Sequence, residues 1–344
     1  MSTDSDNTIE LEPMITGILG TIEKEREREI ISRRFGLFDR KETLEQIGEF
    51  LGITRERVRQ LEKAVVSKLK ESAQKDLPHI KEVEEVLAKE LAELGNIARI
   101  SEITAKIASV NDRINQSRVS FLAHLSPNLV VIEDNDHYHH LVGLKKVHDD
   151  ESIRKQIDKV AEAVKNIGKP SSIKEVAEIV KNTDHKHVNA LASTSKKLAT
   201  LNDKWGLIKW PTVNPKNIRD KIYVILHVHG KPLHFNEIAK AIKDSEFKRN
   251  NVTTQAIHNE LIKDGRFVLI GRGIYALKEW GYSKGTVADI ISDVLKKANE
   301  PLHRDEIVKR VLKSRHVKET TILLNLQGKD QFKRVAKATY ALAD

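Results

Sequence analysis

The stretch TLEQIGEFLGITRERVRQLEKAVVSKLK, residues 43–70, constrains the fold more than any other part of the chain. Its apolar residues recur at intervals of three and four, which predicts two amphipathic helices. The first helix places three apolar residues on one face, and the second places four: Leu44, Ile47 and Leu51, then Val58, Leu61, Val65 and Leu69. Because only a short turn separates the two patterns, the segment is predicted to be a helix-turn-helix.

Small and capping residues occupy the positions that such a turn requires. Gly48 lets the two helices approach closely, and Gly52 can adopt the positive φ that other residues resist. Thr54 offers a hydroxyl as the N-cap of the second helix, and Glu56 places a carboxylate in its positive first turn. These residues predict a sharp turn followed directly by a helix with a capped N-terminus.

With the apolar face turned inward, four polar side chains at the start of the second helix point outward together: Arg55, Glu56, Arg59 and Gln60. A recognition helix presents side chains to the major groove of DNA from this end. Arg suits guanine, Glu suits the amino group of cytosine, and Gln suits adenine. The alternative interpretation of such a run is a charged, solvated helix face, which the turn geometry disfavours.

Together with the preceding EREREIISRRFGL, residues 21–72 resemble region 4 of the sigma-70 family of transcription initiation factors, in which this pattern recognises the −35 promoter element. The run RERVRQLE directly after Gly-Ile-Thr is the specific part of the match. The resemblance implies base contacts by Arg55, Glu56, Arg59 and Gln60. It implies phosphate contacts by Thr43, Arg57 and Lys63. The pattern over residues 21–38 predicts one amphipathic helix that ends at Gly36. The resemblance implies that this part of the chain docks on the RNA polymerase core, at the flap of the beta subunit.

Composition bounds the remaining possibilities. The chain has 344 residues, 39% of them hydrophobic, and a net charge of +9, which favours several small domains and a polyanionic partner. The absence of cysteine excludes disulfides, thiolate zinc sites and cysteine nucleophiles. With neither a signal peptide nor a long apolar run in the sequence, we expect a cytoplasmic, nucleoid-associated bacterial protein that makes no membrane contact.

Beyond Leu77-Pro78 the chain reads as four versions of one unit: a helix, a short strand, a two-helix turn and a β-hairpin. The third and fourth copies match at three places: Pro232-Leu233-His234 with Pro301-Leu302-His303, Thr253-Thr254 with Thr320-Thr321, and Tyr275-Ala276-Leu277 with Tyr340-Ala341-Leu342. In the third copy we expect helices at 217–229 and 250–263, a helix capped by Asn236, and a hairpin turning at 271–273. In the second copy we expect a helix over HVNALASTSKKLATL, residues 187–201.

The third copy resembles the HARE-HTH winged helix of the delta subunit of bacterial RNA polymerase, which also occurs in some DNA-associated and restriction proteins. KPLHFNEIAKAI and DGRFVLIGRGIYALKEW, within residues 217–282, carry this resemblance. Its aromatic and apolar hairpin residues are interpreted as packing residues: Phe267, Tyr275, Leu277 and Trp280. Arg272 at the hairpin tip is a candidate phosphate or minor-groove contact, and alternatively a simple exposed turn residue.

Sites for metals and catalysis find little support. Asp134, Asp136, His137, His139 and His140 are ligand types for metals, but neighbouring residues in a strand point to opposite faces, which favours a polar hairpin tip. No phosphate-cradling or nucleophile-elbow motif is present. We therefore expect no metal, no cofactor, no catalytic residue and no enzymatic activity.

The sequence predicts a mainly α protein with small β-hairpins, a helix-turn-helix domain followed by tandem winged-helix units. The expected segments are a disordered tail at 1–12, the region 4-like domain at 13–76, and units at 79–148, 152–213, 214–282 and 283–344. The predicted function is a bacterial DNA-binding transcription regulator or sigma-like factor that contacts double-stranded promoter DNA or RNA polymerase and lacks a promoter-melting region. Two alternatives stay open: a delta-like polymerase accessory or scaffold with weak DNA contact, and a non-catalytic recognition subunit of a DNA-processing system.

Overall fold

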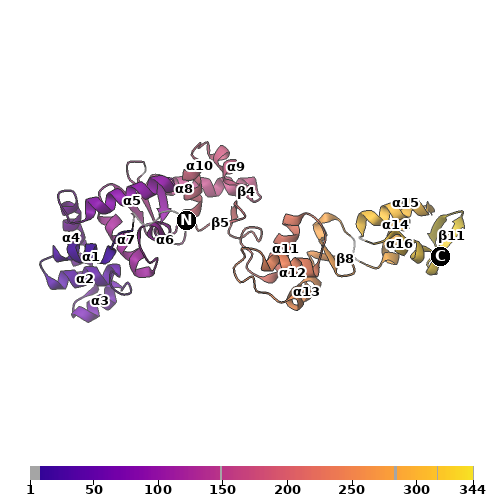
Figure 1. The fold of residues 1–344 in the computed structure, drawn as a ribbon, viewed down its shortest axis with the longest axis horizontal. Coiled ribbons are helices and arrows are strands. Elements are labelled where there is room, and N and C mark those ends of the chain that lie inside the picture. The colour runs from indigo at the N-terminus through magenta and orange to yellow at the C-terminus, as the bar shows by residue number, and fades with distance from the viewer. Residues whose placement is uncertain (1–7, 148, 283–284, 316, 344) are drawn as a thin grey trace. The chain divides into compact units, whose positions relative to one another are not determined.

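The structure, a computed structural model, describes residues 8–147, 149–282, 285–315 and 317–343. It consists of helices and small three-stranded antiparallel sheets, so the predicted mainly α fold with small β-hairpins is confirmed (Figure 1). The chain forms two compact units, residues 1–208 and 209–344. Within the described residues, no helix combines the length and apolar character needed to cross a membrane.

Three helices of the first unit form what we call the head: α2 (Glu25–Phe35), α3 (Leu44–Leu51) and α4 (Arg55–Ala73). Ile30, Ile47 and Val58 are fully buried where these helices meet, one from each. Leu44, Leu51 and Leu61 pack against them from partly buried positions. The predicted apolar faces of the helix-turn-helix are therefore confirmed, around a core of only a few side chains.

The turn between α3 and α4 has the predicted conformation. Gly52 adopts a left-handed conformation at φ 64°, and the Thr54 side chain accepts a hydrogen bond from the Arg57 backbone N–H. At the other end of α3, Thr43 and Gln46 form a reciprocal capping box. The caps at the N-termini of α3 and α4 satisfy backbone N–H groups that would otherwise be unpaired. Local hydrogen bonds therefore support the small core.

Gly48 marks the closest approach of α3 to the turn, and its replacement is our first prediction. A Cβ at Gly48 would lie 2.7 Å from the carbonyl oxygen of Ile53, a backbone atom that cannot rotate away. We expect Gly48→Ala to destabilise the head by about 1–3 kcal/mol through overpacking, although alanine favours helices elsewhere. Gly20→Ala is the matched control, since a Cβ there meets nothing within 4 Å. Hydrogen exchange of α3 and α4 measures the stability of the head in both variants. Equal protection of these helices in the two variants would contradict the prediction.

An additional helix, α1 (Leu11–Gly20), precedes the head. The expected single helix over residues 21–38 is wrong, because Thr21 ends α1 and α2 begins only at Glu25; its end before Gly36, at φ 66°, is as predicted. Leu11 is buried and already helical, so the expected tail of residues 1–12 ends before it, while residues 1–7 lie outside the described part. Pro13 stands in the first turn of α1, where the missing N–H is tolerated.

The remainder of the chain repeats one order of elements four times. Each repeat contains a helix, a short strand, two helices and two further strands, and the last strand lies at the centre of an antiparallel sheet. In the first unit, repeat 1 comprises α5 (Ile80–Leu94), β1 (Ile97–Arg99), α6 (Ile100–Ile107), α7 (Arg113–Leu125), β2 (Leu129–Ile132) and β3 (Leu141–Leu144). Repeat 2 comprises α8 (Asp150–Ile167), β4 (Ser171–Ser172), α9 (Ile173–Val180), α10 (His185–Thr194), β5 (Leu198–Leu201) and β6 (Lys204–Leu207).

The second unit contains the other two repeats. Repeat 3 comprises α11 (Ile218–His229), β7 (Leu233–His234), α12 (Phe235–Lys243), α13 (Thr254–Lys263), β8 (Phe267–Gly271) and β9 (Ile274–Leu277), followed by the short 3-10 helix η1 (Lys278–Trp280). Repeat 4 comprises α14 (Val287–Ala298), β10 (Leu302–His303), α15 (Arg304–Ser314), α16 (Glu319–Gly328), β11 (Phe332–Ala336) and β12 (Thr339–Leu342).

Several predicted boundaries within the repeats are wrong. His234, not Asn236, caps α12, and α13 begins at Thr254, since Thr253 caps it. The helix expected over 187–201 ends at Thr194, where the chain continues into β5. Phe267, Tyr275 and Leu277 are buried and Trp280 packs against the hairpin, as predicted for packing residues.

The third helices of repeats 3 and 4 correspond at a different register from the one expected. Buried Ile257 and Leu261 of α13 correspond to buried Ile322 and Leu326 of α16, an offset of 65. The match of Thr253-Thr254 with Thr320-Thr321 is therefore wrong by two residues, because burial of the apolar pair fixes which residues correspond.

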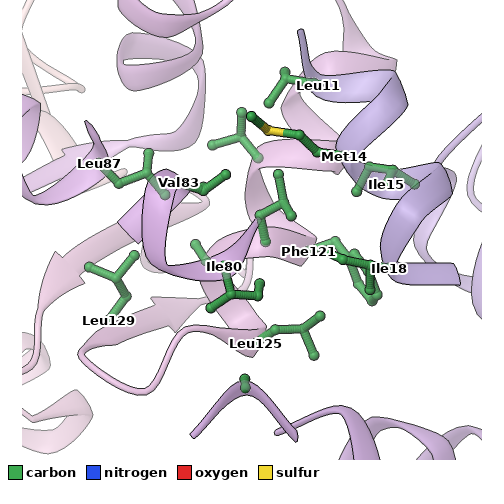
Figure 2. Close-up of a cluster of buried hydrophobic side chains, with 14 of the residues drawn as sticks. Leu11, Met14, Ile15, Ile18, Ile80, Val83, Leu87, Phe121, Leu125 and Leu129 are labelled. Carbon is green, nitrogen blue, oxygen red and sulfur yellow. The ribbon is translucent and has the colours of Figure 1, made fainter. Parts of the chain in front are cut away.

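The head is not a separate body within its unit. One continuous hydrophobic cluster includes α1, the second half of α4, and repeat 1. Figure 2 shows side chains of α1, such as Ile18, pointing toward Ile80 of α5 and Phe121 of α7. Val65, Leu69 and Ala73 of α4 belong to the same cluster. The helix that carries the candidate recognition residues is thus anchored at its far end in the core of repeat 1.

Candidate nucleic-acid interface

The predicted base-reading residues form one exposed surface at the start of α4. Arg55, Glu56, Arg59 and Gln60 are all exposed, whereas Val58 between them is fully buried. The buried valine fixes the rotation of the helix, so that these four side chains face outward. The geometric part of the prediction, a single polar face at the N-terminus of the second helix, is what the structure shows.

Hydrogen bonds connect the side chains of this surface to one another. Both oxygens of Glu56 accept from the Arg59 guanidinium, at 2.9 Å from Nε and 2.7 Å from Nη2. Gln60 Nε2 lies 3.5 Å from the Glu56 carboxylate, and its Oε1 accepts from Arg57 Nη1 at 3.3 Å. Glu56, Arg57, Arg59 and Gln60 thus hold each other in defined orientations. Arg55 projects without an ion pair among the described residues.

The charges on this surface are stabilised by their pairing. The hydrogen bonds from Arg59 hold the pKa of Glu56 below its ordinary value, and those to Glu56 raise the pKa of Arg59. Glu56 is therefore a carboxylate acceptor and Arg59 a cation at neutral pH. One acceptor beside guanidinium and amide donors is the mixture that distinguishes base pairs in the major groove.

The predicted phosphate-contacting residues differ in exposure, hydrogen bonding and location. Lys63 is exposed one turn beyond the base-reading surface, and Arg57 is exposed beside it. The hydroxyl of Thr43 already serves the capping box of α3. Arg272 is exposed at the turn between β8 and β9, in the other compact unit, so the structure does not group it with the head.

Polar contacts from α2 reach both α3 and α4. Arg34 Nε donates to Glu62 of α4 at 3.2 Å, and Arg26 Nη2 donates to the carbonyl of Leu51 at 2.6 Å. The Arg33 guanidinium lies 3.7 Å from the centre of the exposed Phe50 ring. One contact joins α2 to α4 and two join α2 to α3, so polar interactions supplement the small apolar core between these helices.

Arg118 of α7 connects the head to repeat 1, and sequence reasoning did not identify it. Its buried guanidinium donates to the carbonyl oxygen of Leu37 at 2.8 Å and to Glu12 at 2.7 Å. The residue comes from a helix far along the chain, and a single arginine in an amphipathic pattern carries no signal for such a contact. The contact ties the end of α2 to both α1 and α7.

A cavity of about 530 Å³ next to the head is a second feature that sequence reasoning missed. Arg40 and Lys41 line it from the loop after α2, and Arg113, Ser117 and His140 line it from repeat 1. Lys41 is paired with Glu133, whereas Arg40 and Arg113 pair with no carboxylate among the described residues. Burial lowers the pKa of His140, so the positive charge comes from Arg40, Lys41 and Arg113. Asp39 also lines the cavity and offsets part of this charge.

The Asp-His loop of repeat 1 is a structural contact. Asp134 pairs with Lys196 at 2.7 Å, which holds the pKa of its carboxyl below the usual range, and the His139 backbone N–H donates to Thr194. The part of the chain that the structure describes contains no group of three or more His, Asp or Glu arranged to hold a metal. This loop instead joins repeat 1 to repeat 2.

Comparison with known proteins finds a family that matches the segment containing these residues. Residues 24–71 match the family described as Sigma-70, region 4. Those residues span α2, α3 and nearly all of α4, so the region 4-like helix-turn-helix predicted from the sequence is confirmed for the head.

Individual relatives agree over this segment. The chain is 44% identical over 63 residues to the RNA polymerase sigma factor RpoD of Helicobacter pylori, 18% of this chain and 9% of that protein. It is 52% identical over 46 residues, 13% of this chain and 8% of that protein, to the sigma factor sigB of Arabidopsis thaliana. It is 44% identical over 57 residues, 16% of this chain and 14% of that protein, to the sigma factor SigA1 of Synechococcus elongatus. The chain thus spans a small part of the length of these relatives.

Proposed function

We propose that the chain is a sigma-like transcription factor whose head reads −35-type promoter DNA through the first turns of α4. The observation that carries the proposal is the exposed set Arg55, Glu56, Arg59 and Gln60 on a capped helix, within a segment similar to region 4 of sigma factors. In this arrangement the four side chains reach base edges in the major groove, and Arg57 and Lys63 neutralise neighbouring phosphates.

The same proposal includes RNA polymerase as a partner. The relatives are named RNA polymerase sigma factors, and the head retains the three helices of the matched segment. We propose docking on the polymerase core at the flap of the beta subunit. The four repeats are proposed to be winged helices, the third of the HARE-HTH type, with no catalytic role. Arg40, Lys41 and Arg113 at the cavity beside the head would extend the phosphate contacts.

A binding assay on the full chain tests this function and is our second prediction. Labelled duplexes with and without a TTGACA-like element are titrated with the chain, with and without core polymerase, at several salt concentrations. We expect tighter binding to the duplex that bears the element. We also expect affinity to fall by about a thousandfold between 50 and 200 mM salt if six or more phosphates are contacted.

Two results would contradict the proposal. Equal affinity for both duplexes at every salt concentration, in the presence and absence of polymerase, removes the promoter-reading role. Binding to polymerase with no salt-dependent DNA affinity identifies the chain instead as a polymerase accessory or scaffold.

A further inference from the structure

The third helices of the four repeats differ sharply in burial. In repeats 1 and 2, seven of the 13 residues of α7 and six of the ten of α10 are buried. In repeats 3 and 4, only two of ten are buried in each of α13 and α16. The first two repeats therefore enclose this helix, and the last two expose it.

Neighbouring elements cover the enclosed helices. Phe121 of α7 stacks against Phe35 of the head, with ring centres 4.8 Å apart. His187 of α10 is hydrogen-bonded to the carbonyl of Gly95 at 2.7 Å, and a Cβ at Gly95 would lie 2.7 Å from the Lys186 backbone. A helix needs a free face to enter the major groove. The contacts of these two helices leave exposed only Arg113 at the start of α7 and His185, Lys186 and Asn189 in the first half of α10.

Repeat 3 has a second feature that the other repeats lack. The loop between its second and third helices, residues 244–253, has ten residues, against five at 108–112 and four each at 181–184 and 315–318. Repeat 4 also has apolar Leu324 at the exposed position that Asn259 occupies in α13. α13 exposes apolar Ile262 near its C-terminal end, whereas its first half presents Gln255 and Asn259. Among the described repeats, this polar first half and the ten-residue loop occur together in repeat 3.

The long loop is held in a defined shape. Lys221 of α11 is 5% exposed, and its ammonium donates to the carbonyls of Lys248 and Arg249, each at 2.8 Å. The Asn250 amide donates to the carbonyls of Lys243 and Ser245. Burying a cation costs free energy unless it is fully hydrogen-bonded, and here it fixes a loop that bears two exposed cations. The loop is therefore organised before any ligand binds.

The hairpin of repeat 3 adjoins its third helix. The Phe235 backbone N–H donates to Gly273 at 3.0 Å, and the Phe235 ring lies 5.0 Å from the His258 ring of α13. Arg272, next to Gly273, is thereby connected to the helix that carries Gln255 and Asn259. These two side chains share a hydrogen bond of 3.0 Å on the exposed side of α13.

We propose that repeat 3 binds the phosphate backbone of duplex DNA through Lys248, Arg249 and Arg272, with α13 in the groove between them. Repeats 1 and 2 serve as a structural link to the head and do not read DNA. The three cations pair with no carboxylate among the described residues. The same loop also carries exposed Asp244 and Glu246, which precede Lys248 in the chain. This inference rests on the proposed function, because it requires that the chain binds duplex DNA. It adds which of the four repeats contacts the DNA.

The test compares Lys248→Gln/Arg249→Gln with wild type in the full chain, by titrating duplex DNA between 50 and 200 mM salt. Each phosphate contact contributes about 0.9 to the slope of log affinity against log salt, so we expect the slope to fall by about 1.8. Wild type then loses about twelvefold more affinity than the variant across this range. Lys155→Gln/Lys165→Gln, which removes two exposed cations from α8 of repeat 2, is the matched control and should leave the slope unchanged.

The outcomes separate this inference from the proposed function. A slope equal to that of wild type, or an equal fall in the control, overturns the assignment of repeat 3 even if the chain still prefers the −35-type duplex. A variant that loses affinity for core polymerase while keeping the DNA slope identifies the loop as a protein contact and also overturns it. A lowered slope with unchanged preference between duplexes supports it, because base reading belongs to the head.

Discussion

Replacing Arg55 and Gln60 together by alanine is expected to erase the preference for a −35-type duplex while docking on core polymerase is retained. Both side chains are exposed on the first turns of α4 and lie outside the core of the head, so the variant keeps its fold. Each well-placed bidentate contact to a base contributes about 1–3 kcal/mol of discrimination, so the pair accounts for about 2–6 kcal/mol. Preference should fall by a factor of about thirty or more. Competition binding with matched and unmatched duplexes measures it.

The control for this experiment removes the same classes of side chain from the other end of the helix. Lys68 and Gln74 are exposed at the end of α4, away from the candidate surface. Lys68→Ala/Gln74→Ala should weaken binding to both duplexes equally or leave it unchanged. If Arg55→Ala/Gln60→Ala distinguishes the duplexes as wild type does, the recognition surface is wrongly assigned, whatever the affinity.

The turn and the exposed polar surface at the start of α4 were predictable because they depend on local interactions. Gly52 requires a left-handed conformation, Thr54 caps the residue three positions later, and Val58 fixes the rotation of the helix. Each of these contacts spans a few residues, so the pattern in the sequence contains all the participants. Cap geometry and helical period then determine which side chains face outward.

The predictions were wrong where burial in the tertiary structure determines the helix boundary or the register. Residues 21–24 carry no proline or glycine to mark the break between α1 and α2, and an acidic start before Pro13 concealed α1. The pairing of Thr253 with Thr320 followed residue identity, whereas the buried apolar pairs of α13 and α16 set the true register. Arg118 and the cavity beside the head depend on contacts between α7 and the loop after α2, which no local pattern encodes.

These tertiary contacts matter for the proposed function because they anchor the helix that carries the candidate base-reading residues in a larger core. The cluster formed by α2, α3 and α4 alone has three fully buried side chains, whereas Ile31 of α2 and the far half of α4 belong to the continuous cluster with α1 and repeat 1. We therefore expect the orientation of α4 to depend on repeat 1 as much as on its own helix-turn-helix partners. We expect the candidate base readers and the first repeat to fold as one unit, because they share this cluster.

Phe121→Ala is expected to destabilise the head and repeat 1 together by about 3–5 kcal/mol, the usual loss for truncating a buried phenylalanine. Phe121 is fully buried in α7 and is among the largest enclosed side chains of the described residues. It contacts Phe35 of α2 and belongs to the same cluster as Ile18 and Leu69, so the cavity affects three elements of the unit. Hydrogen exchange should lose protection in α1, α4, α5 and α7 in parallel.

The control is Phe38→Ala, which removes the same side chain from a position that is 42% exposed. Its ring lies 5.6 Å from the Arg118 guanidinium, so we expect a loss of only about 0.5–1 kcal/mol. If Phe121→Ala lowers protection in α5 and α7 but leaves α4 as in wild type, the head folds independently of repeat 1. If the second unit, residues 209–344, loses protection as well, the cooperative unit is larger than the contacts within residues 1–208 imply. Parallel loss confined to α1–α7 is the result that a shared core requires, because a cavity at Phe121 removes contacts from every helix packed around it.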